Sequence, residues 1–460
     1  MQSTICAIAT APGGAIGIIR VSGPMAIPFT EKIFRPLSGK PLAKRKVHSL
    51  TFGHIVAQNG ELIDEVLVSL FRAPHSYTGE DSTEISCHGS TYILQRVLEE
   101  LIQAGCTIAS PGEYTKRAFL NGKMDLSQAE AVADLIASSS AASHHMAMNQ
   151  MRGEFSKELT GLRDKLLHIT SLMELELDFS DHEELEFANR DELADLALHI
   201  QNVIGRLIES FHVGNAIKSG VPVAIVGETN AGKSTLLNAL LNEERAIVSD
   251  IHGTTRDVIE DTLNIEGVTF RFIDTAGIRE TTDTIENLGI ERSMAKMDQA
   301  DIILWVIDAT APAHYDMKLV NKIQELQSEK KIFVLFNKCD QPHNDLSLDA
   351  LGLSNLESLN LSAREKSGIS TLKNRLLAVT SLPKLENSDI LVSNVRHFEA
   401  LRAAHDSISR VRDGLSLQLP GDLISQDLRE CIQHLGEITG GEVTPDAVLQ
   451  NIFKNFCIGK

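Results

Sequence analysis

Apolar residues are spaced differently in successive stretches of the chain. In the first 120 residues they form short runs between turns, which predict the strands Ile16–Ile19, Glu65–Phe71 and Thr83–Cys87. Helical spacing between Tyr92 and Gln103 predicts a helix in the same stretch. Together these elements indicate an α+β domain.

From Asp125 onward, apolar residues recur every three to four positions until about Ile208. No proline interrupts residues 125–210, so the pattern predicts long helices, with Ser127 as a candidate cap of the first. The acidic run Asp178–Glu186 indicates a junction between helices, although a solvated helix face is the plainer interpretation of such a run.

Between residues 221 and 380, short apolar runs alternate with helical stretches. The predicted strands are Val223–Val226, Thr269–Ile273, Ile302–Ile307 and Ile332–Phe336. Strands that alternate with helices favour a mainly parallel sheet built from βαβ units.

Helices return after about residue 385 and are predicted at Val395–Val411, Leu423–Leu435 and Pro445–Phe453. Because helical stretches flank the α/β stretch on both sides, we expect a multidomain protein in which an α/β domain is inserted into a discontinuous all-α domain. The predicted domains are residues 1–120 (N-terminal α+β), 121–217 (first helical part), 218–380 (inserted doubly wound α/β domain) and 381–460 (second helical part).

Composition narrows the class of protein. The chain has 460 residues and a net charge of −19, which opposes binding to nucleic acid through bulk charge; an RNA contact would need a local basic patch or a more basic partner. The six cysteines form no C-x-x-C pair, which argues against a zinc framework and favours a reducing compartment. No basic residue precedes Arg20, and the longest apolar stretch is Ile302–Ile307. We therefore expect a cytoplasmic protein that does not bind a membrane.

The segment Gly227–Ser234 matches the phosphate-loop pattern G-x-x-x-x-G-K-[ST] between a predicted strand and a predicted helix. Its glycines let backbone amides surround a phosphate, Lys233 would reach the β- and γ-phosphates, and the Ser234 hydroxyl would bind Mg²⁺. The nucleotide-binding residues predicted in this loop are Asn230, Ala231, Gly232, Lys233, Ser234 and Thr235.

A second motif, Asp274-Thr275-Ala276-Gly277, ends the next apolar strand. Asp274 suits a role near Mg²⁺, and the amide of Gly277 can approach the γ-phosphate because no side chain intervenes. Between the two motifs, Thr255 would supply the second protein hydroxyl to Mg²⁺ from a switch segment.

A third motif, Asn337-Lys338-Cys339-Asp340, points to guanine. A carboxylate at Asp340 can accept from both N1–H and the exocyclic amine of guanine, a donor pair that adenine lacks. Lys338 would pack along the base, and Asn337 would tie this loop to the phosphate loop. Ser362, Ala363 and Arg364 fit the last guanine-contacting loop. The motifs together predict a GTP-hydrolysing, Ras-like G domain; an ATPase or a degenerate site is the alternative.

The hydrolytic step departs from the design of small regulatory GTPases, which place Gln directly after D-T-A-G to orient the attacking water. Here that position is Ile278, which cannot orient water. The residues alone leave Glu280, Asp283 and Glu286 as candidate carboxylates, and their spacing assigns no arginine finger.

The chain resembles the MnmE (TrmE) family of tRNA modification GTPases along its whole length. The resemblance rests on Asn230 and on the stretches Gly17–Gly23, Ser76–Asp81, Pro111–Thr115, Ser249–Asp257, Asp274–Arg279 and Phe456–Lys460. Glu228 and Thr229 depart from the Arg-Pro that is common in the family.

The resemblance implies that K⁺ beside the phosphates replaces an arginine finger. Asn230, Ser249, Ile251 and Thr254 match its ligands, and Glu286 matches the water-orienting carboxylate. The switch residues implied to contact GTP are Ser249, Asp250, Ile251, His252, Gly253, Thr254 and Thr255. A fixed cation at the β–γ bridge would stabilise charge that develops in the transition state. G domains of two protomers are expected to meet and order these loops.

The resemblance also implies a folate-binding-like N-terminal domain that mediates homodimerisation and holds 5-formyltetrahydrofolate. Arg20, Glu84, Lys123 and Lys460 match its folate positions; each taken alone would be interpreted as a surface charge. Cys457 is a candidate nucleophile by its position near the chain end.

Members of the family act with a flavin-dependent partner, MnmG, in a heterotetramer or larger assembly. The resemblance implies formation of an aminomethyl or carboxymethylaminomethyl group at C5 of the wobble uridine of certain tRNAs, with a tetrahydrofolate one-carbon unit. Two other classes remain: a regulatory GTP-binding switch that binds RNA without chemistry, and a dynamin-like membrane GTPase. This chain lacks the basic amphipathic stretch that a dynamin-like membrane GTPase would need.

Overall fold

The computed structural model describes residues 3–178, 189–242, 261–273, 294–311, 316–342, 348, 353, 355–380, 390–440, 449, 452–454, 456 and 459. The chain forms two compact units. The first comprises Met1–Ile136, Met148–Asn202 and Ala400–Lys460, and the second comprises Ala137–Ala147 and Val203–Glu399.

The first unit begins with a seven-stranded sheet in the order β3-β4-β5-β6-β2-β1-β7. β1 and β7 pair in parallel, and the other neighbours pair antiparallel. The strands are β1 (Ile5–Ile8), β2 (Ile16–Ser22), β3 (Phe34–Pro36), β4 (Ser49–Val56), β5 (Leu62–Phe71), β6 (Ser82–His88) and β7 (Thr107–Ile108).

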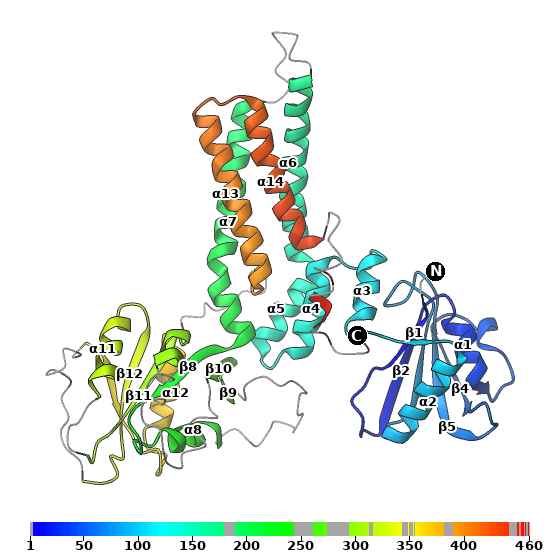
Figure 1. The fold of residues 1–460 in the computed structure, drawn as a ribbon, viewed down its shortest axis with the longest axis horizontal. Coiled ribbons are helices and arrows are strands. Elements are labelled where there is room, and N and C mark those ends of the chain that lie inside the picture. The colour runs from blue at the N-terminus through cyan, green and yellow to red at the C-terminus, as the bar shows by residue number, and fades with distance from the viewer. Residues whose placement is uncertain are drawn as a thin grey trace. The chain divides into compact units, whose positions relative to one another are not determined.

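One face of this sheet is covered by helices. Along β5, the buried side chains Val66, Val68 and Leu70 alternate with more exposed ones, because successive residues of a strand point to opposite faces. The buried face packs against α1 (Ala26–Ile33) and α2 (Thr91–Ala104), as Figure 1 shows in blue and cyan. A 3-10 turn, η1 (Leu42–Lys44), and the helix α3 (Glu113–Leu120) complete this part.

The strands predicted within Ile16–Ile19, Glu65–Phe71 and Thr83–Cys87 are confirmed as parts of β2, β5 and β6, and the predicted helix is confirmed as part of α2. The strands β1, β3, β4 and β7 were not predicted. β3 and β7 have three and two residues, too few for a period to be visible.

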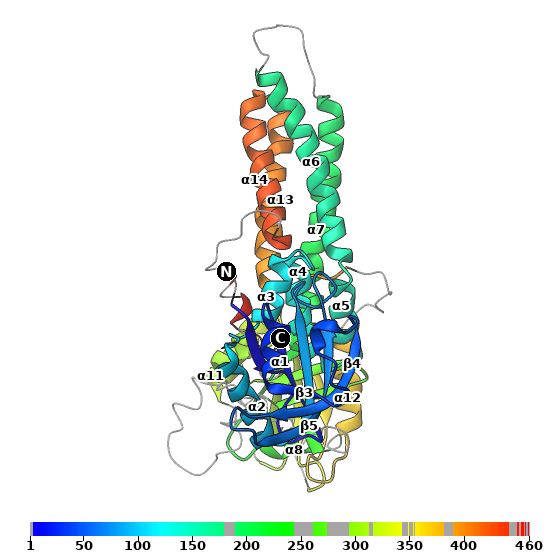
Figure 2. The ribbon, with the colours of Figure 1, turned by 90° about the vertical axis from the view of Figure 1, so that its right-hand side faces the viewer.

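The rest of the first unit is helical, and some of the helices continue into the second unit, which takes Ala137–Ala147 and begins again at Val203. Segments from both sides of the α/β region lie side by side in one bundle, in both views of Figures 1 and 2. The helices are α4 (Leu126–Ala137), α5 (Ala141–Met151), α6 (Glu154–Asp178), α7 (Arg190–Ser219), α13 (Val395–Ser416) and α14 (Gly421–Thr439). Gln201 Nε2 donates to Ser409 Oγ (2.9 Å), which joins α7 to α13, and Arg429 Nε pairs with Glu174 Oε1 (2.8 Å), which joins α14 to α6. The all-α domain is therefore discontinuous in sequence, as predicted.

Most of the acidic run Asp178–Glu186, which separates α6 from α7, lies outside the described residues, as does most of the predicted helix Pro445–Phe453. The first described helix after residue 385 is α13, which extends beyond the predicted end at Val411 to Ser416. Among the described residues, no helix combines the length and the apolar character needed to cross a membrane.

The second unit contains a six-stranded sheet in the order β13-β12-β11-β8-β10-β9. Neighbouring strands are parallel except for the hairpin of β9 and β10. The strands are β8 (Val221–Val226), β9 (Asp261–Ile265), β10 (Val268–Phe272), β11 (Ile302–Asp308), β12 (Lys331–Asn337) and β13 (Glu357–Asn360).

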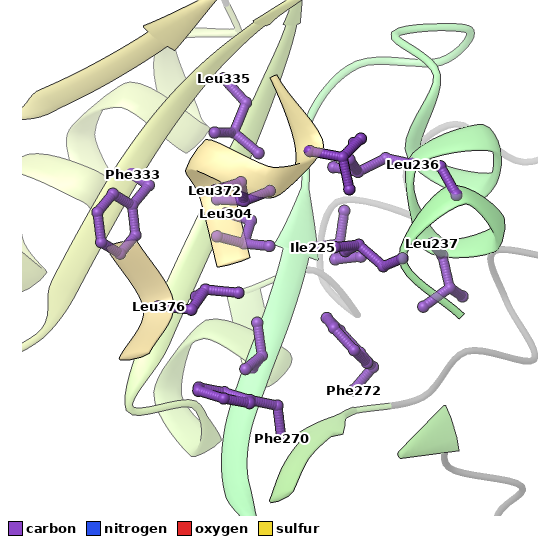
Figure 3. Packing of buried hydrophobic residues seen from close by; sticks show 14 of the residues in the cluster. Ile225, Leu236, Leu237, Phe270, Phe272, Leu304, Phe333, Leu335, Leu372 and Leu376 are labelled. Atoms are coloured by element: carbon purple, nitrogen blue, oxygen red, sulfur yellow. The ribbon is translucent and has the colours of Figure 1, made fainter. Parts of the chain in front are cut away.

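Helices cover both faces of this sheet. Ile225, Leu304 and Leu335 pack on one side against α8 (Lys233–Asn242) and α12 (Ile369–Val379), as Figure 3 shows. Ile303 and Trp305 of β11 pack on the other side with residues of α11 (Met317–Leu326). Burial on both faces explains why the strands are continuous apolar runs in the sequence. The doubly wound α/β architecture is thus confirmed.

The hairpin strand β9 was not predicted, because its sequence Asp-Thr-Leu-Asn-Ile contains only two large apolar residues. The turn after it has positive φ at Glu266 (49°) and Gly267 (90°), the geometry that suits a two-residue hairpin connection. The division of the chain into four domains at residues 120, 217 and 380 stays a prediction.

Candidate functional site

The loop between β8 and α8 has left-handed backbone at Asn230 (φ 64°) and Gly232 (φ 95°), and Gly227 has φ 146°. A Cβ at Gly227 would lie 2.2 Å from the carbonyl oxygen of Val306, and a Cβ at Gly232 would lie 2.2 Å from Asn337 Nδ2. Both positions therefore require glycine, and the chain can fold tightly around the N-terminus of α8. This is the shape that presents backbone amides to a phosphate.

Lys233 crosses this loop from the first position of α8. Its ammonium donates to the carbonyl oxygens of Gly227 (2.8 Å) and Glu228 (2.7 Å). Burial, followed by the charge of Lys296, lowers the pKa of Lys233, and the charge of Glu228 opposes this shift. A partly buried ammonium favours a nearby anion. Ser234 and Thr235 follow in the same turn of the helix.

Asn337 links three loops at the carboxyl ends of parallel strands. Its side chain is buried, its Nδ2 donates to the carbonyl oxygen of Ala231 (2.8 Å), and its Oδ1 accepts from the amide of Ala363 (2.9 Å). The predicted tie between the N-K-x-D loop and the phosphate loop is thus present. The same residue also holds the loop that contains Ser362 and Arg364.

The carboxylate of Asp340 is exposed beside that loop. A hydrogen bond from Ser362 lowers its pKa most, and the charges of Arg364 and Lys338 act in the same direction, while partial desolvation opposes them. The carboxylate is therefore held ionised, as an acceptor of two N–H groups must be.

One residue of this site, Asp308, was not predicted from the sequence. Asp308 ends β11, lies opposite Asn337 in the strand register, and its Oδ2 is 2.5 Å from Lys338 Nζ. The available signal was its position, since a polar residue directly after the buried run Ile302–Ile307 lies at the same sheet edge as the N-K-x-D motif.

A second candidate site lies on the N-terminal sheet. Arg20 of β2 and Glu84 of β6 are directly opposite in register, and Arg20 Nε (2.9 Å) and Nη2 (2.8 Å) both donate to Glu84 Oε1. Their side chains remain 22% and 26% exposed, so a ligand could reach both charges.

Two tyrosines orient Arg20. Its guanidinium carbon lies 5.5 Å from the centre of the Tyr77 ring and 5.6 Å from that of Tyr114, within the range of cation–π attraction. The hydroxyl of Tyr114 donates to the carbonyl oxygen of Arg20 (2.7 Å). The sequence had marked these tyrosines only within family-like stretches, not as parts of a site.

The other predicted folate positions are less directly connected. Lys123 Nζ donates to the carbonyl oxygen of Pro74 (3.0 Å), and its stem lies beside Gly79 in the loop that also holds Tyr77. Arg20 Nη1 contacts the carbonyl oxygen of Gly459 (3.4 Å), the neighbour of Lys460 in sequence. The structure thus joins Arg20 with Glu84 but records no contact of Lys123 with either among the described residues.

Several predicted site residues and the alternative carboxylates lie outside the described residues: Ser249, Asp250, Ile251, His252, Gly253, Thr254, Thr255, Asp274, Thr275, Ala276, Gly277, Glu280, Asp283, Glu286, Cys457 and Lys460. The binding role of every predicted residue stays a prediction.

Two family models together match almost the whole length of the chain. The model described as the MnmE helical domain matches residues 126–457, and the model described as the GTP-binding protein TrmE N-terminus matches residues 4–123.

Full-length relatives cover the whole chain. The tRNA modification GTPase MnmE of Bacteroides thetaiotaomicron is 63% identical over 468 residues, covering 100% of both proteins. The protein of the same name from Phocaeicola vulgatus is 61% identical over 496 residues, covering 100% of this chain and 99% of the relative. A solved structure of Aquifex aeolicus Era is 29% identical and covers 40% of this chain and 66% of its own chain, with a TM-score of 0.27. By its matched models and relatives, the chain belongs to the MnmE (TrmE) family of tRNA modification GTPases.

Proposed function

We propose that this protein hydrolyses GTP and thereby serves the modification of tRNA. The observation that carries the nucleotide assignment is the position of Asn337, which ties the phosphate loop at Ala231 to the loop of Ala363. Asp340 is held ionised beside the second of these loops by Ser362 and Arg364. One nucleotide would therefore meet the phosphate loop and the base-reading carboxylate together.

The variant Asp340→Asn tests the base assignment. An amide in place of the carboxylate keeps the shape but offers a donor, which suits the 2-oxo group of xanthine better than the amine of guanine. We expect the Kd for GDP to rise about 100-fold and that for XDP to fall, measured by isothermal titration. Equal binding of ADP and GDP by the wild-type protein would refute the assignment.

Hydrolysis is proposed to use Mg²⁺ held by Ser234 and Thr255, and K⁺ held by Asn230, Ser249, Ile251 and Thr254. Support comes from the left-handed backbone of Asn230 in the phosphate loop, where its side chain is exposed. K⁺ would supply positive charge at the transferred phosphate, the role that an arginine finger has elsewhere. Turnover should be faster in K⁺ than in Na⁺ at equal ionic strength, and equal rates would exclude this ion.

Glu286 is proposed as the residue that orients the attacking water. The variant Glu286→Ala should bind GTP with unchanged Kd and lose turnover, because the carboxylate acts on water and not on the nucleotide. Retained turnover would direct attention to Glu280 or Asp283, whose alanine variants are the matched controls.

The N-terminal site is proposed to bind 5-formyltetrahydrofolate through Arg20, Glu84, Lys123 and Lys460. The paired, partly exposed charges of Arg20 and Glu84 support this, since a carboxylate can accept from pterin N–H groups and a guanidinium can donate to ligand oxygens. Titration with 5-formyltetrahydrofolate should give a heat of binding that Arg20→Met removes. Arg45→Met, in the loop directly after η1, is the control. Absence of heat with intact protein would favour a regulatory GTP-binding switch.

The protein is further proposed to form a homodimer through its N-terminal domain. The sheet face away from α1 and α2 exposes Leu50 (59%), Phe52 (44%) and Leu67 (39%), with Phe52 directly opposite Leu67 in register. Adjacent exposed apolar side chains on one face favour association. Phe52→Glu should give a monomer by light scattering, whereas Tyr92→Glu, at an exposed position (67%) of α2 on the other side of the sheet, should not; an intact Phe52→Glu dimer would exclude this face.

The proposed reaction is addition of an aminomethyl or carboxymethylaminomethyl group at C5 of the wobble uridine in the cytoplasm, together with the flavin-dependent partner MnmG. A partner that contributes positive charge agrees with the net charge of −19. Cys457 is kept as a candidate nucleophile. Mass spectrometry of tRNA from cells that lack this chain should show unmodified wobble uridine, and unchanged tRNA would refute the proposed role.

A further inference from the structure

The carboxylate of Asp308 serves two different partners with its two oxygens. Oδ1 accepts from the amide of Thr310 (3.0 Å) and from its hydroxyl (2.7 Å), which closes a tight turn directly after β11. Oδ2 is 2.5 Å from Lys338 Nζ. The first pair of contacts fixes the direction in which the second oxygen points.

Lys338 reaches this oxygen because of the backbone around it. Its φ of 68° is left-handed, so the chain turns sharply after β12. β11 and β12 are in parallel register, with Asp308 opposite Asn337, and the amide of Ala309 donates to the carbonyl oxygen of Asn337 (3.0 Å). The side chain of Lys338 is therefore restrained at both ends: the left-handed backbone sets the direction in which it starts, and Asp308 holds its ammonium.

The protonation state of Asp308 matches this role. Burial raises its pKa, but the hydrogen bonds from Lys338 and Thr310 together with the charge of Lys338 outweigh that effect, so the net pKa lies below its usual value. The pair therefore balances the charge of a lysine within the base-reading loop whose side chain is 32% exposed.

We propose that Asp308 is a positioning residue that holds the stem of Lys338 as a wall along the face of a bound purine. The inference rests on the proposed guanine nucleotide site and adds a residue that acts through Lys338 without touching the base. Because the stem contacts the ring face and not its edge, the effect is independent of the 2-amino group that Asp340 reads.

A rival role is stability alone, which is the weaker explanation because a pair of this exposure contributes little to folding. The two roles differ in their consequences. A purely structural pair changes the melting temperature and leaves nucleotide affinity unaltered. A positioning pair lowers affinity for every purine nucleotide, because each binding event must then order a long, free side chain.

The test uses Asp308→Asn in the full-length protein, with GDP and IDP as probes in isothermal titration. The amide keeps an Oδ1 for Thr310 and loses only the anionic partner of Lys338, so the turn is retained. Both Kd values should rise by the same factor, about fivefold. The matched control is Asp298→Asn, which removes one of the two carboxylates paired with Lys322 (2.9 Å) elsewhere in the same unit and should leave both Kd values unchanged.

A double-mutant cycle with Lys338→Met completes the test, since methionine keeps an unbranched stem but has no charge for Asp308 to hold. In that background Asp308→Asn should cause no further loss of affinity. Unchanged Kd values in Asp308→Asn, or an equal loss with and without Lys338, would overturn the inference while the wild-type GDP affinity stands. Wild-type protein that binds neither GDP nor IDP would instead overturn the guanine site and this inference with it.

Discussion

Lys233 shows how the fold keeps a charged side chain partly buried at a site where a ligand would bind. Its ammonium is partly buried among loop carbonyl oxygens, and burial and Lys296 lower its pKa below the ordinary 10.5. The charged form is therefore less favourable in the folded chain than in the unfolded chain. Phosphate oxygens would supply the missing negative charge, so the cost of burial in the free protein is regained on binding.

The variant Lys233→Met should lose nucleotide affinity by about 10- to 100-fold, the range for a hydrogen bond to a charged group. In the pH range between the lowered folded pKa and 10.5, the unfolded wild-type chain holds more protons, so the unfolding free energy contributed by Lys233 rises with pH. Urea titrations of both proteins at several alkaline pH values should show wild type gaining stability relative to the variant. A constant difference would contradict the buried-charge interpretation.

The buried ion pair of Arg117 and Glu80 is expected to contribute to the stability of the fold. Arg117 and Glu80 are each 8% exposed and 3.1 Å apart, and Glu80 also accepts from Ser22 Oγ (2.7 Å). Glu80→Ala should lower the unfolding free energy by about 3 kcal/mol, because the remaining buried charge loses a partner. Glu65→Ala, at an exposed carboxylate (59%), should change it by less than about 1 kcal/mol in the same urea titration. Similar losses in both would contradict this account.

At the scale of elements, parallel strands bring the nucleotide-site residues to one edge of a sheet. β8, β11, β12 and β13 run in the same direction, so the loops after them meet. The contact of Asn337 with Ala231 exists because Gly232 leaves room for its side chain. The fit between two loops is therefore a property of the sheet and not of either motif.

Gly232→Ala should therefore cost more than its backbone strain alone. Gly267→Ala is a matched control, since Gly267 has a similar φ (90° against 95°) and nothing within 4 Å of the added Cβ. We expect both variants to lose about 1–3 kcal/mol in unfolding free energy, with a further loss and weaker GDP binding only in Gly232→Ala. Equal effects on GDP affinity would show that the Asn337 bridge does not matter.

At the scale of the whole molecule, the chain is divided so that each proposed ligand has its own unit. Arg20 and Glu84 belong to the first unit, and the phosphate loop and Asp340 belong to the second. The first unit is completed by Ala400–Lys460, so the helical bundle requires segments from both sides of the α/β region.

Calorimetry of the full-length protein should show two unfolding transitions, one for each unit. GDP at 100 times its Kd should stabilise one unit by about 2.7 kcal/mol and raise only its transition, while 5-formyltetrahydrofolate should raise only the other. A single transition that shifts with both ligands would mean that the units unfold together.

Local sequence patterns determined the positions of many strands and the identity of the candidate nucleotide site. Apolar runs bounded by turns located β2, β5, β6 and the central strands of the second sheet, since burial of one or both faces leaves a period in the sequence. The phosphate-loop and N-K-x-D motifs identified the candidate nucleotide site, because phosphate and guanine demand fixed residue types at short spacing. β9, with few apolar residues, left no such period.

Only the tertiary structure decided which distant side chains meet. The pairing of Asp308 with Lys338, and of Arg20 with Glu84 near two tyrosine rings, depends on strand register and on turns with left-handed backbone. The alternation along a strand sets which face a side chain takes, but the residue that it meets there is decided by the pairing of strands that are distant in sequence. Motifs therefore named the chemistry, and the packing of strands determined which charged groups were brought into contact.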